Sequence, residues 1–210
     1  MSKKNIYSRN RPIRTPAKIL YLFCEGEKTE PNYFCAIHRK YRDILRDKFS
    51  LQIKDTFHTD PIGLVEEAKD LLRLNETQKG DIIWCVFDVN NNNNNTLNNA
   101  FQRAGKKIQI ALSNPCFEVW YILHFKYSTA SIRSSEEAVS ILKEYIPNYE
   151  KNCDVLDTLS QKPNSLADAI NGSKQLNDYH ETSGNNVNFQ SGNPSTQVFK
   201  IIELLGIHKY

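Results

Sequence analysis

The 210-residue sequence contains no long hydrophobic run, and this limits where the protein can act. No apolar stretch approaches the roughly 20 residues that a membrane-spanning helix needs, so we expect no membrane partner. The first residues are basic, but neither an apolar segment nor a cleavage site follows them, as would be usual in a secretory signal. We therefore expect a cytoplasmic protein.

Cysteine is scarce and unpaired. The five cysteines are odd in number and widely spaced, and no C-x-x-C motif is present. This spacing disfavours a zinc knuckle and a disulfide scaffold. Cys24 and Cys85 lie in strand-like runs, where we expect them to be small buried apolar side chains. A nucleophilic cysteine is the alternative.

The glycine-rich loops that bind nucleotide phosphates are also absent. Neither G-x-G-x-x-G nor G-K-[ST] occurs, and no nucleophile–base pair is recognisable. A small-molecule kinase or hydrolase is therefore disfavoured. The formal net charge is only +3, although six basic residues fall within the first eighteen. This basic arm, residues 1–17, either contacts nucleic acid or only keeps the protein in solution.

Hydrophobic patterning predicts an α/β fold with a mainly parallel, four-stranded central sheet flanked by helices. Apolar runs alternate with helical patterns between residues 18 and 112, which is typical of a three-layer domain. The expected strands are residues 18–24, 51–57, 81–88 and 107–112, and the expected helices between them begin at residues 29, 60 and 96. The third strand is almost wholly apolar between two acids, so we expect it to be buried on both faces.

Beyond residue 129 the pattern is helical. Residues 134–146 open with the S-x-x-E capping pattern of Ser134 and Glu137, and Gly206 is an expected C-cap of the last helix. A polar loop at residues 180–195 separates the final two helical segments. We therefore divide the chain into the basic arm, an α/β domain at residues 18–128, and a helical extension on the same core at residues 129–210.

Two of the expected strands end in acids: Glu25 follows the first and Asp88 ends the third. In an open parallel sheet, sites form at the carboxyl ends of the strands. Carboxylates there, with no phosphate loop, suggest Mg²⁺, with Mn²⁺ as an alternative. Mg²⁺ takes oxygen ligands, keeps waters and can stabilise charge during phosphodiester cleavage. The simpler interpretation is that acids such as Glu27 and Glu30 only favour a helix start.

Four segments resemble a known family. They are "LFCEGEKTEPNYF", "VFDVN", "SNPCFEVWYILHF" and "NPSTQVFKIIELL". In this order, over nearly the whole chain, they resemble the RloB-like family, also called the AbiL type of abortive-infection proteins. That family is similar to the Toprim domain of topoisomerases, primases and OLD-type nucleases. The resemblance implies a Toprim-like fold that binds Mg²⁺ through a glutamate, here Glu25, and an Asp-x-Asp motif, here Asp88-Val89-Asn90.

The resemblance also implies a biological setting. Members are typically encoded beside an ABC-type ATPase in phage-defence loci, and related ATPase–Toprim pairs act as triggered nucleases, some on tRNA. We therefore expect a Mg²⁺-dependent nuclease that cuts DNA or RNA together with an ABC-type ATPase partner. Glu25 would act as general acid/base or metal ligand.

Asn90 departs from the family pattern, which expects a second aspartate. An amide oxygen can bind Mg²⁺ without formal charge, so binding should weaken by about 1 kcal/mol or more. Three outcomes are open: a weaker metal site, compensation by Glu30 or Glu118, or a catalytically weakened binding or sensor module. The run of six asparagines, residues 90–95, is then either the rim of the site or a tolerated low-complexity loop.

Three further residues have two interpretations each. Lys28 could meet a phosphate or simply be solvated at a helix start. Glu118 could contact a metal or a backbone donor, or face water. His124 could act as a general acid/base or phosphate contact, or be a hydrogen-bonded structural histidine.

The last helix also has two interpretations. Its apolar face could pack on the sheet or on the partner ATPase.

Overall fold

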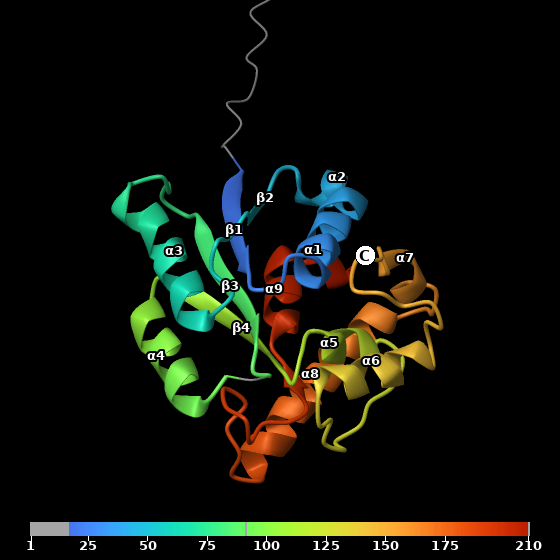
Figure 1. The fold of residues 1–210 in the computed structure, drawn as a ribbon. Helices are drawn as coiled ribbons and strands as arrows, with labels where there is room; N and C mark the ends of the chain where they lie inside the picture. Colours follow the sequence, from blue (N-terminus) through green and yellow to red (C-terminus); the bar gives the residue numbers. More distant parts are fainter. Residues whose placement is uncertain (1–16, 91, 210) are drawn as a thin grey trace, which may run out of the picture.

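The computed structural model describes residues 17–90 and 92–209, and within them five strands form one sheet (Figure 1). Their bounds are β1 (Lys18–Cys24), β2 (Phe49–Lys54), β3 (Ile82–Asp88), β4 (Ile108–Asn114) and β5 (Ser195–Thr196). The spatial order is β2-β1-β3-β4-β5; the first four strands are parallel and β5 is antiparallel to β4. The predicted α/β fold with a mainly parallel sheet is confirmed. The basic arm lies outside the described residues except for Ala17.

The prediction of four strands was wrong by one short strand. Thr196 pairs with Ser113 and Ser195 with Asn114, and the hydroxyls of Ser113 and Thr196 lie 2.9 Å apart in a hydrogen bond. A two-residue strand carries no periodic pattern, because alternation needs at least four residues to be recognised. Only the approach of distant segments creates β5.

Asp60, Ser134 and Gly206 cap helices as predicted, whereas Thr29, also expected as a cap, is the first residue of α1 and forms no capping hydrogen bond. The bounds of the helices are α1 (Thr29–Lys40), α2 (Arg42–Leu45), α3 (Pro61–Arg73), α4 (Asn94–Ala104), α5 (Glu118–Ile122), α6 (Ser135–Lys143), α7 (Leu156–Leu159), α8 (Ser165–Thr182) and α9 (Val198–Leu205), followed by the 3₁₀ turn η1 (Ile207–Lys209). The Asp60 carboxylate accepts from the N–H groups of Ile62 and Gly63 at the start of α3. Ser134 caps α6, and Gly206, at φ 69°, ends α9. These local signals act through orphan backbone groups at helix ends.

The segment between residues 29 and 49 differs from expectation. We predicted one helix after β1, but the chain breaks at Tyr41 (φ −105°, ψ 20°) and turns toward β2. The aromatic and aliphatic density of the segment after β4 predicts a helix packed into the core, and this is confirmed by the short helix α5, whose Trp120 is completely buried.

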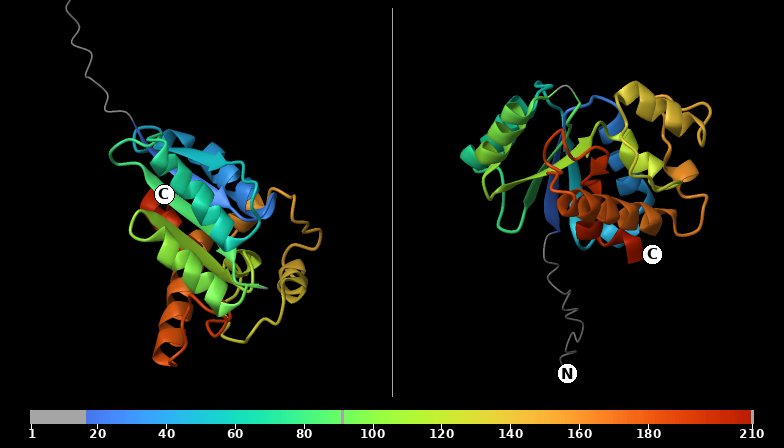
Figure 2. Two further views of the ribbon diagram at one scale, coloured as in Figure 1. Left: turned by 60° about the vertical axis from the view of Figure 1, so that its left-hand side comes forward. Right: turned by 90° about the horizontal axis from the view of Figure 1, so that it is seen from below.

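Helices cover both faces of the sheet (Figures 1 and 2). Helices α3 and α4 pack against the face that carries Phe23, Cys85 and Phe87. Helices α1, α5, α8 and α9 cover the opposite face, which carries Leu22 and Trp84. β3 is thus buried on both faces, as its apolar run predicted, and Cys24 and Cys85 are buried.

The connections define where a site can form. The chain leaves β1 toward α1 on one face of the sheet and leaves the neighbouring strand β3 toward α4 on the opposite face. At such a switch point the two connections diverge and leave a crevice beyond the carboxyl ends of the strands. Helix α9 packs on the sheet, with Val198, Ile201 and Ile202 buried. No helix within residues 17–90 and 92–209 is long and apolar enough to cross a membrane.

Candidate functional site

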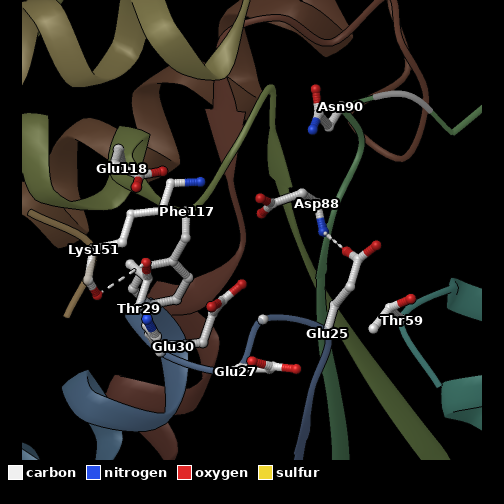
Figure 3. Close-up of a pocket in the computed structure, with 12 residues that line it drawn as sticks. Glu25, Glu27, Thr29, Glu30, Thr59, Asp88, Asn90, Phe117, Glu118 and Lys151 are labelled. Carbon is white, nitrogen blue, oxygen red and sulfur yellow. Dashed lines mark hydrogen bonds between the residues drawn. The ribbon is translucent and has the colours of Figure 1, made fainter. Parts of the chain in front are cut away.

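A pocket of about 350 Å³ occupies the crevice at this switch point (Figure 3). Most of the side chains that the sequence singled out line it. They are Glu25, Lys28, Glu30, Asp88, Asn90 and Glu118. They come from the ends of β1 and β3, the start of α1 and the start of α5, so segments nearly 100 residues apart meet here.

Glu25 and Asp88 are held together by the sheet itself. The Glu25 N–H continues the strand ladder to the carbonyl of Val86 at 2.9 Å. Its carboxylate then accepts a hydrogen bond of 2.8 Å from the backbone N–H of Asp88. Burial raises the pKa of Glu25, while this bond and the amide of Asn92 lower it. The Glu25 carboxylate is therefore fixed across the end of the neighbouring strand.

Asp88 carries the least satisfied oxygen of the site. Its Oδ1 is enclosed and has no hydrogen-bond partner among the residues that the structure describes. Burial and the nearby carboxylates of Glu30, Glu25 and Glu118 raise the pKa of Asp88 well above its ordinary value, and Lys151 partly opposes them. An orphan carboxylate oxygen costs free energy unless a cation or a proton satisfies it. The Asp88 carboxylate is therefore suited to bind a cation or to hold a proton.

Glu30 is buried against the turn that follows β1, with 4% of its surface exposed. A Cβ on Gly26 would lie 2.2 Å from Glu30 Oε2, so the missing side chain at Gly26 makes room for the carboxylate. Burial, opposed by its own backbone N–H but assisted by Glu118 and Glu25, raises the pKa of Glu30 to about 7. Glu30 is therefore placed to hold a proton near neutrality.

Glu118 begins α5 and is 2% exposed. Its Oε1 accepts a 2.9 Å hydrogen bond from the hydroxyl of Tyr149. Burial and the Glu118 charge both raise the pKa of Tyr149, which keeps the phenol protonated as a donor. Glu118 does not face water, and its partner is a side-chain hydroxyl that sequence reasoning did not consider.

Lys151 is the pocket residue that sequence reasoning missed. It belongs to the polar loop between α6 and α7, where nothing in "YEKNC" indicates a site. The Thr29 hydroxyl donates to its carbonyl at 3.4 Å, and its side chain runs into the pocket toward the acids (Figure 3). Lys151 is the cation that opposes the raised pKa of Glu30 and of Asp88, whereas Lys28, which precedes α1, lines the pocket and is exposed.

Asn90 lies at the rim of the pocket, beyond Asp88 (Figure 3). Its backbone takes a positive φ of 23°, a region that asparagine tolerates better than most residues. Its N–H donates to the carbonyl of Pro115 at 2.9 Å. The amide side chain is exposed, so it remains available to a ligand.

The neighbouring asparagines are folded into the structure, apart from Asn91, which lies outside the described residues. The amide of Asn92 donates to the Asp88 carbonyl at 3.1 Å, and Asn93 caps α4 through Thr96 N–H at 2.9 Å. Asn94 Oδ1 accepts from the N–H of Gln190 at 3.1 Å. The tract therefore joins the rim of the site to the loop between α8 and β5, which is shorter than the predicted loop 180–195 because α8 extends to Thr182 and β5 begins at Ser195.

His124 is not brought to the pocket. It is 2% exposed, its Nδ1 lies 2.9 Å from the Trp120 carbonyl, and its ring meets the Trp120 ring edge to face. Burial lowers the pKa of His124 to about 4. This environment is that of a neutral structural histidine, so we remove His124 from the candidate catalytic residues.

The lining suits a hard divalent cation in part. Carboxylate and amide oxygens are the ligands that Mg²⁺ and Mn²⁺ prefer, and the free Asp88 oxygen offers one. In the part of the chain that the structure describes, however, no three acidic, histidine or cysteine side chains converge closely enough to hold an ion. An ion here would have one or two protein carboxylates and several waters, which is usual for Mg²⁺.

Comparison with known proteins identifies the family of the chain. No curated protein sequence and no solved structure matches the chain. A family model described as RloB-like protein matches residues 20–205. That span includes β1 from Leu20 onward, strands β2 to β5, and every residue that lines the pocket, from Glu25 to Lys151. The chain belongs to the RloB-like family.

Proposed function

We propose that this protein is a Mg²⁺-dependent nuclease with a Toprim-like arrangement of its catalytic acids. One observation carries the proposal: Glu25 and Asp88 lie at the ends of adjacent parallel strands, at the switch point of the sheet, and Asp88 Oδ1 has no hydrogen-bond partner among the described residues. The same two positions match the glutamate and the first aspartate of the Toprim pattern. The pocket is also the place where open α/β sheets bind their ligands.

The residues that line the pocket would have separate roles in binding the ion and the substrate. Asp88 and Glu25 would hold the ion, with Asn90 offering a neutral oxygen from the rim. Lys28 and Lys151 would attract the phosphodiester and balance its charge. A bound Mg²⁺ would supply Lewis-acid stabilisation of the phosphate oxygens. The surrounding carboxylates would then position water or the leaving oxygen.

The wider setting rests on the family. We infer a role in phage defence, DNA or RNA (including tRNA) as substrate, and an ABC-type ATPase as partner. Since α9 uses its apolar face on the sheet, the ATPase would contact another surface. A second function is favoured by Asn90 and by the lack of three converging ligands among the described residues. It is a non-catalytic binding or sensor module that keeps the fold.

Calorimetry with Mg²⁺ and Mn²⁺ tests the metal site. The unmodified protein should bind either ion, Glu25→Gln should weaken binding at least tenfold, and Glu27→Gln should not. Glu27 lines the same pocket but is exposed, so it controls for the general loss of negative charge. Equal effects of the two substitutions would mean that only the local potential, and no specific ligand, attracts the ion.

Asn90→Asp separates the enzyme from the binding module. A second anion near the ion should tighten Mg²⁺ binding by about 1 kcal/mol or more, roughly fivefold to tenfold. Cleavage of labelled DNA and RNA, with and without the ATPase, is then measured for both proteins. Cleavage by the unmodified protein supports the nuclease. Cleavage by neither, despite metal binding by Asn90→Asp, favours the binding module.

A further inference from the structure

The β2–α3 loop, residues 55–60, stands beside the pocket at the carboxyl edge of the sheet. The Thr56 hydroxyl donates to the carbonyl of Cys24 at 3.1 Å, directly before Glu25. Thr59, three residues on, lines the pocket (Figure 3). Phe57 lies between Thr56 and Thr59 along the chain, so its backbone stands next to the pocket, while its side chain is not one of the lining residues.

Phe57 is 93% exposed, more than the other exposed large apolar side chains within residues 17–90 and 92–209, which are Leu74, Tyr127 and Tyr179. A single exposed apolar residue is common and by itself means little. Phe57 differs because its loop is fixed. The N–H groups of Phe57 and His58 both donate to Glu67 Oε1, at 2.9 and 3.1 Å, and Asp60 caps the helix that follows. The ring is therefore presented to solvent on an ordered loop.

If the pocket holds a phosphodiester, as proposed above, an exposed aromatic ring beside it is suited to contact the neighbouring nucleobase. Unpaired bases stack on exposed aromatic rings regardless of sequence, while nearby cations hold the backbone. The pocket supplies those cations through Lys28 and Lys151. Bases in a duplex are already stacked inside the helix and present no free face to a side chain.

We propose that Phe57 is a stacking platform for an unpaired nucleobase, so that the substrate of the pocket is single-stranded nucleic acid. This inference rests on the proposed function, because it assumes that a phosphodiester occupies the pocket. It adds a binding residue and a substrate class that neither the strand-end acids nor the asparagine tract specifies. The base next to the bound phosphate would lie on Phe57.

Fluorescence anisotropy with short labelled single strands, of DNA and of RNA, tests the platform in EDTA and in Mg²⁺. Phe57→Ala should weaken single-strand binding by about 5- to 150-fold, the usual range for one stacked base. Phe57→Trp should retain binding, whereas Phe57→Leu, which is apolar but has no π face, should not. Leu74→Ala removes an exposed apolar side chain at the other end of α3 and should change nothing.

The outcomes are separable. Unchanged single-strand affinity in Phe57→Ala, a preference for duplex, or no nucleic-acid binding at all would each overturn the platform. So would a loss of ATPase binding with intact nucleic-acid binding, which would make Phe57 a protein contact. Single-strand binding through Phe57 without metal binding or cleavage would leave the platform standing and remove the nuclease. Thermal melting should be the same for Phe57→Ala and the parent, because the ring is exposed.

Discussion

Replacing Asp88 by asparagine is expected to abolish Mg²⁺ binding and to make the metal-free protein more stable. Loss of an outer-shell partner alone typically weakens metal binding 10- to 100-fold, so loss of a direct ligand should weaken it at least 100-fold. Stability should rise because the buried carboxylate has an unpartnered oxygen and faces three other acids. The pKa of Asp88 is raised, so ionisation destabilises the fold increasingly as the pH rises above the unfolded value.

The measurement pairs calorimetry with thermal melting at pH 8, in EDTA and in Mg²⁺. Asp157→Asn is the matched control, since that side chain is 99% exposed, does not line the pocket, and makes only an exposed ion pair with Lys40 at 3.5 Å. A lower melting temperature in EDTA for Asp88→Asn would show that Asp88 is structural. Unchanged Mg²⁺ affinity would place any metal site elsewhere.

Replacing Glu30 by glutamine is expected to stabilise the protein at high pH and much less at low pH. The pKa of Glu30 rises from 4.5 to about 7 on folding. Below 4.5 both states are protonated. Between 4.5 and 7 the folded protein keeps a proton that the unfolded chain has lost, so stability falls as the pH rises. Above pH 7 Glu30 is ionised in both states, and its burial lowers the free energy of unfolding by the full amount, on the order of 3 kcal/mol.

Glu30→Gln removes this cost because its amide cannot ionise. The gain should be on the order of 3 kcal/mol at pH 8, or about 6–12 °C in melting temperature for a chain of this size, and less than about 1 kcal/mol at pH 5. Melting in EDTA across this pH range measures it, with Glu27→Gln as the exposed control. A gain that does not depend on pH would show that packing, not charge, causes it.

The effects expected for Asp88→Asn and Glu30→Gln have the same physical cause. Five acidic side chains line one pocket, four of them buried or partly buried, and Lys151 is the cation that lowers the raised pKa values of Glu30 and Asp88. The arrangement is unfavourable without a bound cation or proton. Such stored electrostatic cost is frequent where a protein prepares to bind a charged ligand. A structural acid cluster would be expected to carry more internal partners.

The sequence by itself determined the elements whose signals are local. The apolar runs of β1 and β3 are long enough to show burial on both faces, and their terminal acids, Glu25 and Asp88, can be identified at once. Asp60 and Gly206 could be identified as caps because a cap acts on backbone groups within a few residues of itself. Because the carboxyl ends of parallel strands lie at the same edge of a sheet, these two acids were expected to share that edge.

Only the tertiary structure decided which distant groups join that edge. Lys151 enters from a loop with no distinguishing pattern, Tyr149 supplies the partner of Glu118, and β5 completes the sheet from near the end of the chain. The structure likewise buried His124 among aromatic side chains instead of exposing it at the site. The physical reason is the range of the interactions. Periodicity and capping depend on neighbours along the chain, whereas burial, pKa and pocket lining depend on which surfaces meet after folding.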